Sequence, residues 1–102
     1  MPANSEPDQL AEIVAVEERT VLLPKQLHAR PAGEVAQVAA RNRGTTIELI
    51  HGEKRVNARS VLAVMALGAV TGQEVGVVVS GPDAEAVADE VAAILARPET
   101  DE

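Results

Sequence analysis

The sequence predicts an α+β domain of two layers, in which helices cover one face of a mostly antiparallel sheet. Three observations lead to this fold class. The chain has 102 residues, which suits one hydrophobic core and leaves no room for a second. Its apolar residues alternate between short strand-like runs and stripes at helical spacing, in the order β-α-β-β-α-β-α. Glycine or proline residues separate these segments at the positions where turns are expected.

The first strand is expected at residues 19–23, where aliphatic and β-branched residues precede Pro24. A helix is expected at residues 29–43, because apolar side chains recur there at helical intervals and Gly44 follows. The same reasoning predicts a hairpin of two strands at 45–51 and 54–57, a short helix at 60–67, a valine-rich strand at 74–80, and a last helix that begins at residue 84 and ends at Pro98.

Charge divides the chain into a domain and two acidic ends. Residues 1–16 are expected to be a disordered acidic extension, residues 17–97 the domain, and residues 98–102 an acidic tail. The formal net charge of −7 hides a basic segment, since residues 19–59 hold eight basic and three acidic side chains. A basic surface of this kind suits an anionic ligand or an acidic partner.

Composition excludes several classes of function. Without any aromatic residue there is no platform on which bases could stack, so nucleic acid is not an expected partner. Without cysteine and with only two histidines, neither a disulfide nor a structural zinc site is expected, and no cofactor or metal is predicted. No apolar run reaches the length of a membrane span and no secretion signal is visible, so the chain is expected in the cytoplasm. A monomer is expected.

The segment that carries chemistry is residues 27–33, Leu-His-Ala-Arg-Pro-Ala-Gly. His28 stands where a loop becomes a helix, and backbone N–H groups at a helix start lack carbonyl partners and favour anions. Arg30 adds a planar guanidinium that suits phosphoryl oxygens. Ala29 and Pro31 support the helix start, where the missing N–H of proline costs little. The segment thus offers a nucleophile beside donors for a dianion.

A histidine at a helix start is more often a cap or a loop residue than a nucleophile, so spacing alone does not decide its role. No P-loop or nucleotide fingerprint accompanies His28. The domain could therefore hold a phosphoryl group but has no visible means of taking it from ATP by itself.

Two motifs in register resemble those of the HPr family, the phosphocarriers of the bacterial phosphoenolpyruvate-dependent sugar phosphotransferase system. The first is Leu-His-Ala-Arg-Pro-Ala at residues 27–32, and the second is Asn-Ala-Arg-Ser-Val-Leu-Ala-Val-Met-Ala-Leu-Gly at residues 57–68. The resemblance spans roughly residues 17–96. It implies an open-faced sandwich, with a four-stranded antiparallel sheet covered on one face by three helices.

The resemblance also implies a site. His28 matches the histidine that enzyme I phosphorylates on Nδ1 and that passes the phosphoryl group to sugar-specific enzyme IIA domains. Arg30 matches the arginine that supports the phosphoryl group. Ser60 matches a serine at the start of the second helix, which in some bacteria is phosphorylated by an ATP-dependent kinase. The residues that match the docking patch for enzyme I and enzyme IIA are Val61, Leu62 and Met65.

Some features depart from the family or leave alternatives open. Glu34, one turn after Arg30, stands where the family has a neutral polar residue, and it is expected either to weaken docking or to pair with Arg30. His51 lies in a hairpin turn and is expected to have no functional role. The alternatives are a carrier in a nitrogen-related phosphorelay, a regulatory module whose Ser60 phosphoform binds a transcription regulator, and a plain ligand-binding domain with a fortuitous motif.

Overall fold

The structure is a computed structural model that describes residues 15–98. The order of its elements is the predicted one, from a first strand to a last helix. The elements are β1 (Val16–Leu22), α2 (Ala29–Arg41), β2 (Thr46–His51), β3 (Lys54–Asn57), α3 (Val61–Met65), β4 (Glu74–Ser80) and α4 (Ala84–Ala96).

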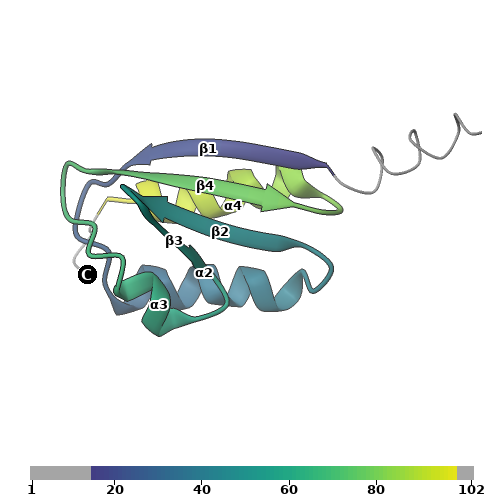
Figure 1. The fold of residues 1–102 in the computed structure, drawn as a ribbon, viewed down its shortest axis with the longest axis horizontal. Coiled ribbons are helices and arrows are strands. Elements are labelled where there is room, and N and C mark those ends of the chain that lie inside the picture. The colour runs from purple at the N-terminus through teal and green to yellow at the C-terminus, as the bar shows by residue number, and fades with distance from the viewer. Residues whose placement is uncertain (1–14, 99–102) are drawn as a thin grey trace, which may run out of the picture.

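The four strands form one antiparallel sheet in the order β1-β4-β2-β3, and α2, α3 and α4 pack against it (Figure 1). β4 is the valine run of the sequence, and it pairs with β1 on one side and β2 on the other. Alternate residues of β4 are buried, as expected for a strand with helices on one face only. The predicted two-layer α+β fold is therefore confirmed.

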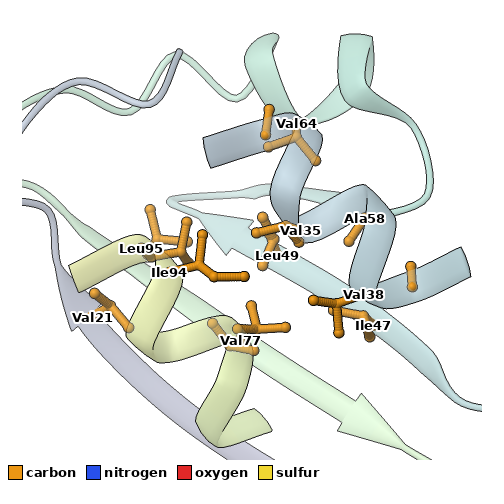
Figure 2. Close-up of a cluster of buried hydrophobic side chains, with 14 of the residues drawn as sticks. Val21, Val35, Val38, Ile47, Leu49, Ala58, Val64, Val77, Ile94 and Leu95 are labelled. Atoms are coloured by element: carbon orange, nitrogen blue, oxygen red, sulfur yellow. The ribbon is translucent and has the colours of Figure 1, made fainter. Parts of the chain in front are cut away.

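The core lies between the sheet and the helices and is built from aliphatic side chains alone. Figure 2 shows side chains of α2, α3 and α4 meeting those of the strands across this layer. The larger side chains that are less than 2% exposed belong to Leu23, Ile47, Leu49, Leu67, Val35, Val38, Val64, Val75, Val77, Val79 and Val91.

β1 begins at Val16, earlier than the expected residue 19, because its first residues pair with the end of β4 up to Val16 opposite Ser80. The pairing places Arg19 beside α4 rather than in solvent. Its guanidinium lies 3.0 Å from a carboxylate oxygen of Glu17 and 3.0 Å from one of Asp89 on α4. Hydrogen bonds to these two carboxylates raise the pKa of Arg19. A charged side chain thus occupies a position where pattern alone would favour an apolar one.

This start of β1 shortens the expected N-terminal extension, because Val16 belongs to the sheet. The expectation of disorder for the rest of that extension concerns residues 1–14, which lie outside the described residues. The acidic tail predicted for 98–102 lies outside them as well, apart from Pro98.

α2 ends at Arg41, two residues before the expected end, because Asn42 turns the chain. The Asn42 side chain donates to the carbonyl of Val38 at 2.8 Å, and its backbone N–H bonds the same turn. An asparagine that bonds the preceding turn in this way competes with continuation of the helix.

α3 is also shorter than the predicted 60–67. It continues only as tighter turns, in which Leu67 N–H donates to Val64 at 3.1 Å and Gly68 N–H donates to Met65 at 3.3 Å. Leu67 is nevertheless buried, so the residue after the shorter helix still contributes to the core.

The turn between β4 and α4 packs against the start of β2. A Cβ atom at Gly81 would lie 2.7 Å from the Gly44 carbonyl oxygen, and the φ angle of Gly81 is +128°, so only glycine fits there. Beside it the hydroxyl of Thr45 donates to the Pro82 carbonyl at 2.8 Å. These contacts hold the last helix at a set position on the sheet.

Candidate functional site

The candidate site forms at the end of the sheet where β1 leads into α2 and where α3 leads into β4 (Figure 1). Two connecting loops run side by side there. Leu23 N–H donates to the Gln73 carbonyl at 2.9 Å, and Leu27 N–H donates to the Ala69 carbonyl at 3.2 Å. Leu23 and Leu27 are themselves buried, so the residue next along the chain, His28, is held at a defined place.

His28 is the N-cap of α2, as the sequence predicts. Its Nδ1 atom accepts a long hydrogen bond of 3.4 Å from the backbone N–H of Arg30, and its carbonyl accepts the first helical bond from Ala32 at 3.1 Å. A nitrogen that accepts carries its lone pair toward the donor, so Nδ1 presents its lone pair to the backbone N–H at the helix start. The half-buried ring thus directs Nδ1 toward the helix start.

The helix start is electrostatically suited to an anion. The first turn of α2 contains no acidic residue, and Pro31 has no N–H, which leaves the N–H groups of Ala29 and Arg30 at this end. The exposed Arg30 guanidinium makes no ion pair or hydrogen bond to any side chain among residues 15–98. This end of α2 therefore offers backbone donors to an anion, and an exposed guanidinium follows two residues after His28.

Glu34 does not form the ion pair with Arg30 that the sequence suggests as one possibility. Its carboxylate accepts instead from the guanidinium of Arg97 at the end of α4, at 2.7 Å. Position in the sequence gives no sign of this contact, because Glu34 and Arg97 meet only once α2 and α4 have packed together. Arg97 is thus a residue near the site that pattern analysis misses.

Ser60 is exposed and caps α3, as predicted, since its Oγ accepts from the Ala63 N–H at 3.0 Å. The guanidinium of the neighbouring Arg59 donates to the carbonyl of Arg43 at 3.2 Å. The cap accounts for a serine here without any further role.

The three residues expected to form a docking patch differ in exposure. Leu62 is 78% exposed and Met65 is 38% exposed, whereas Val61 is half-buried and packs against the core. Val70, on the loop that follows α3, is 44% exposed and was not singled out from the sequence, because an isolated valine in a loop has no periodicity to reveal it.

The second histidine belongs to ordinary structure. His51 Nδ1 lies 3.4 Å from the Glu74 carbonyl oxygen, at the end of β2. Across residues 15–98 no group of three or more His, Asp or Glu residues is placed to hold a metal ion. None of the helices that the structure describes is long and apolar enough to cross a membrane.

Comparison with known proteins assigns the family. A family model described as the PTS HPr component phosphorylation site matches residues 16–97. The phosphocarrier protein HPr of Treponema pallidum (strain Nichols) is 44% identical over 70 residues, which cover 69% of this chain and 72% of the relative. The crystal structure of HPr from Bacillus anthracis (strain Ames) superposes with a TM-score of 0.71 at 32% identity, over 79% of this chain and 98% of that one.

A further solved relative is Crh, the catabolite repression protein of Bacillus subtilis, whose crystal structure shows a dimer with a swapped domain. It is 35% identical with a TM-score of 0.62, over 74% of this chain and 85% of Crh. Family model, sequence relatives and solved structures agree on one assignment. The chain therefore belongs to the HPr family of the phosphotransferase system, whose members are phosphocarriers rather than stand-alone catalysts.

Proposed function

We propose that His28 accepts a phosphoryl group on Nδ1 from enzyme I and passes it to sugar-specific enzyme IIA domains. The observation that carries this proposal is the position of Nδ1 at the start of α2, where it faces the Arg30 N–H, two residues before a guanidinium that has no partner among residues 15–98. Family membership supports the class of chemistry, and the geometry of this chain supports the residue.

The transfer requires few changes at the site. The lone pair of Nδ1 attacks phosphorus, a bond from Nδ1 to phosphorus forms, and the bond to the donor's leaving group breaks. The Arg30 N–H, which now bonds Nδ1, then becomes available to a phosphoryl oxygen. Arg30 adds a charge-assisted contact to a second oxygen, which stabilises the charge that passes between donor and acceptor.

Both partners would dock beside His28 on the exposed apolar surface of α3 formed by Leu62 and Met65, with Val61 at its edge. An exposed pair of large apolar side chains next to a reactive group suits a transient protein contact. The proposed partners place the carrier in the cytoplasm, and we propose that it acts as a monomer.

The experiment that tests the proposal is phosphoryl transfer from phosphoenolpyruvate through purified enzyme I. Wild type and His51→Ala should be labelled at a bond that is labile in acid and stable in base, and His28→Ala should not be labelled. His51→Ala is the matched control, because it removes an imidazole of similar exposure elsewhere. Full labelling of His28→Ala would show that another residue accepts the group.

A second candidate function is regulatory. Ser60 is exposed at the N-terminus of α3, directly before the apolar residues of that helix, so a phosphate on it would change the docking surface. We propose this only as an addition to carriage by His28, with a serine kinase and a transcription regulator as partners. Incubation with such a kinase and ATP, with Ser60→Ala as control, tests it.

A further inference from the structure

We propose that Arg97, at the end of α4, holds Glu34 away from Arg30 and so keeps the Arg30 guanidinium available to the phosphoryl group on His28. Arg97 is in this view a positioning residue, since it acts through Glu34 and does not itself touch the group. The inference rests on the function proposed above for His28.

The first support is the geometry of the ion pair. Arg97 Nη1 and Glu34 Oε1 lie 2.7 Å apart, with the side chains 54% and 33% exposed. This is short for a nitrogen–oxygen contact and typical of a charge-assisted hydrogen bond. The Arg97 backbone N–H also donates to the Ile94 carbonyl at 3.3 Å. The backbone from which the Arg97 side chain extends is therefore fixed at the end of α4.

The second support is the alternative that this pair excludes. Glu34 lies four residues after Arg30 on α2, and residues at that spacing face each other on a helix. Without Arg97, the nearest cation along the helix face is Arg30. A pair between Arg30 and Glu34 would occupy guanidinium donors that the phosphoryl group needs, and it would leave a carboxylate beside an incoming dianion.

The third support is that Arg30 is unpaired where a pair was available to it. Within the described part of the chain its guanidinium has no hydrogen bond or ion pair, although an acidic residue lies one helical turn away. An arginine placed before a glutamate is the weaker order for such a helix pair, so a cation from another element competes well for Glu34.

The fold supplies a matched control. A groove of about 420 Å³ runs between α2 and α4, with the pair of Arg97 and Glu34 among its lining residues and a second ion pair between Arg41 and Glu90. The second pair spans 3.0 Å, also joins α2 to α4, and is 60% and 44% exposed. Arg41→Ala therefore removes one charge and one interhelical pair, as Arg97→Ala does, but at the opposite end of α2 from His28.

The experiment compares rates of phosphoryl acceptance from enzyme I for wild type, Arg97→Ala, Arg97→Lys, Arg41→Ala, Glu34→Gln and the double variant Arg97→Ala with Glu34→Gln. We expect Arg97→Ala to be about two- to fivefold slower than Arg41→Ala at low salt, the effect that exposed charge pairs produce. Arg97→Lys should retain most of the rate. Glu34→Gln should restore the rate of Arg97→Ala, because no carboxylate then competes for Arg30.

A second measurement does not depend on phosphoryl transfer. Nuclear magnetic resonance relaxation of the Arg30 Nε–H group should report a mobile side chain in wild type and Arg41→Ala. In Arg97→Ala it should report a more ordered side chain, and mobility should return in the double variant.

Several results would overturn the inference while leaving His28 as the acceptor. Equal rates for Arg97→Ala and Arg41→Ala, or a double variant as slow as Arg97→Ala, would show that Arg97 does not act through Glu34. An Arg30 side chain equally mobile in all variants would do the same. Absence of labelling in wild type would instead count against the proposed function, and the Arg30 mobility data would still decide whether Arg97 controls Arg30.

Discussion

At the scale of single residues, Arg30 combines a positive charge with a planar set of donors two residues after His28. We expect Arg30→Ala to fold normally, because the side chain is exposed and unpaired within residues 15–98. Loss of a charge-assisted contact is worth about 1.5–3 kcal/mol, so transfer should slow about ten- to a hundredfold if the contact forms only in the transition state. Arg30→Lys should recover little of this rate, because an ammonium is a point charge.

Rapid-quench transfer assays in both directions, with thermal unfolding as a control for folding, check this prediction. A lysine variant as fast as wild type would mean that charge alone matters at Arg30 and that the planar geometry does not.

Ser60 allows the cap and the docking surface to be separated. Ser60→Asp keeps a side chain that caps helices well, so the unfolding midpoint should hold, but it adds a charge directly before the apolar residues Val61 and Leu62. Affinity for enzyme I should therefore fall. Ser60→Ala removes the bond to the Ala63 N–H and should cost about 0.5–2 kcal/mol of stability with affinity unchanged. Calorimetry of binding and of unfolding distinguishes the two variants, and the reverse pattern would contradict this division of roles.

The sequence could identify His28 and Arg30 as candidate site residues because both belong to one short motif at a helix start. It could not show that Arg97 binds Glu34, since that contact depends on how α2 and α4 pack. Nor could it show that Val61 packs against the core while Leu62 stays exposed, because both are apolar residues in one short helical turn.

At the scale of elements, the turn before α4 is the most constrained link in the fold. Gly81→Ala places a Cβ atom against the Gly44 carbonyl and forces a positive φ on alanine, so it should destabilise the domain more strongly than most surface substitutions do. Gly52→Ala, in the hairpin turn, is a suitable control, because that glycine also has a positive φ but nothing within 4 Å of its added Cβ. Urea unfolding of both variants measures the difference, and equal losses would show that the close approach at Gly81 is unimportant.

The hydroxyl of Thr45 makes the other bond at this turn. Thr45→Val keeps the shape of the side chain but leaves the Pro82 carbonyl without its 2.8 Å donor. Because this bond is only partly buried, its loss should cost about 0.5–1.5 kcal/mol, and the unfolding midpoint in urea should fall accordingly without a change in slope. Thr46→Val, at the exposed neighbouring position, should change little.

Whether a segment forms a strand or a helix was predictable, because apolar residues recur at different intervals in the two. Where each helix or strand begins and ends depends on single contacts. The end of α2 is set by the Asn42 side chain on the Val38 carbonyl. The start of β1 depends on pairing with a strand far along the chain, and Arg19 is accommodated there by Glu17 and Asp89. Neither contact has a signature in the local sequence.

At the scale of the whole molecule, the central strand should matter more than the edge. Val77 lies in β4 with none of its side chain exposed, and Val56 lies half-buried in the edge strand β3. Val77→Ala should cost about 2–3 kcal/mol through lost burial and the cavity left behind, and Val56→Ala about 1 kcal/mol or less. Chemical denaturation of the two variants checks the order, and a larger loss at Val56 would contradict the described core.

The predicted fold class was correct for the whole molecule. Few two-layer folds are compatible with this order of strands and helices and with this apolar periodicity. The neighbours of each strand were not predictable in the same way. β1 and β2 are separated in the sheet by β4, which comes much later in the chain.

The position of β4 between β1 and β2 also predicts an order of events when the chain folds. Until β4 is present, β1 has no strand to join, and only the local hairpin of β2 and β3 can form in the sheet. Pairing of segments so distant in sequence is slower than local pairing, because the entropy of closing the long loop must be overcome first. The loop before His28 is bonded to the loop before β4, so we expect His28 to reach its final position only at this late stage. Recovery of phosphoryl acceptance after dilution from denaturant should therefore report the final step of refolding rather than an early collapse.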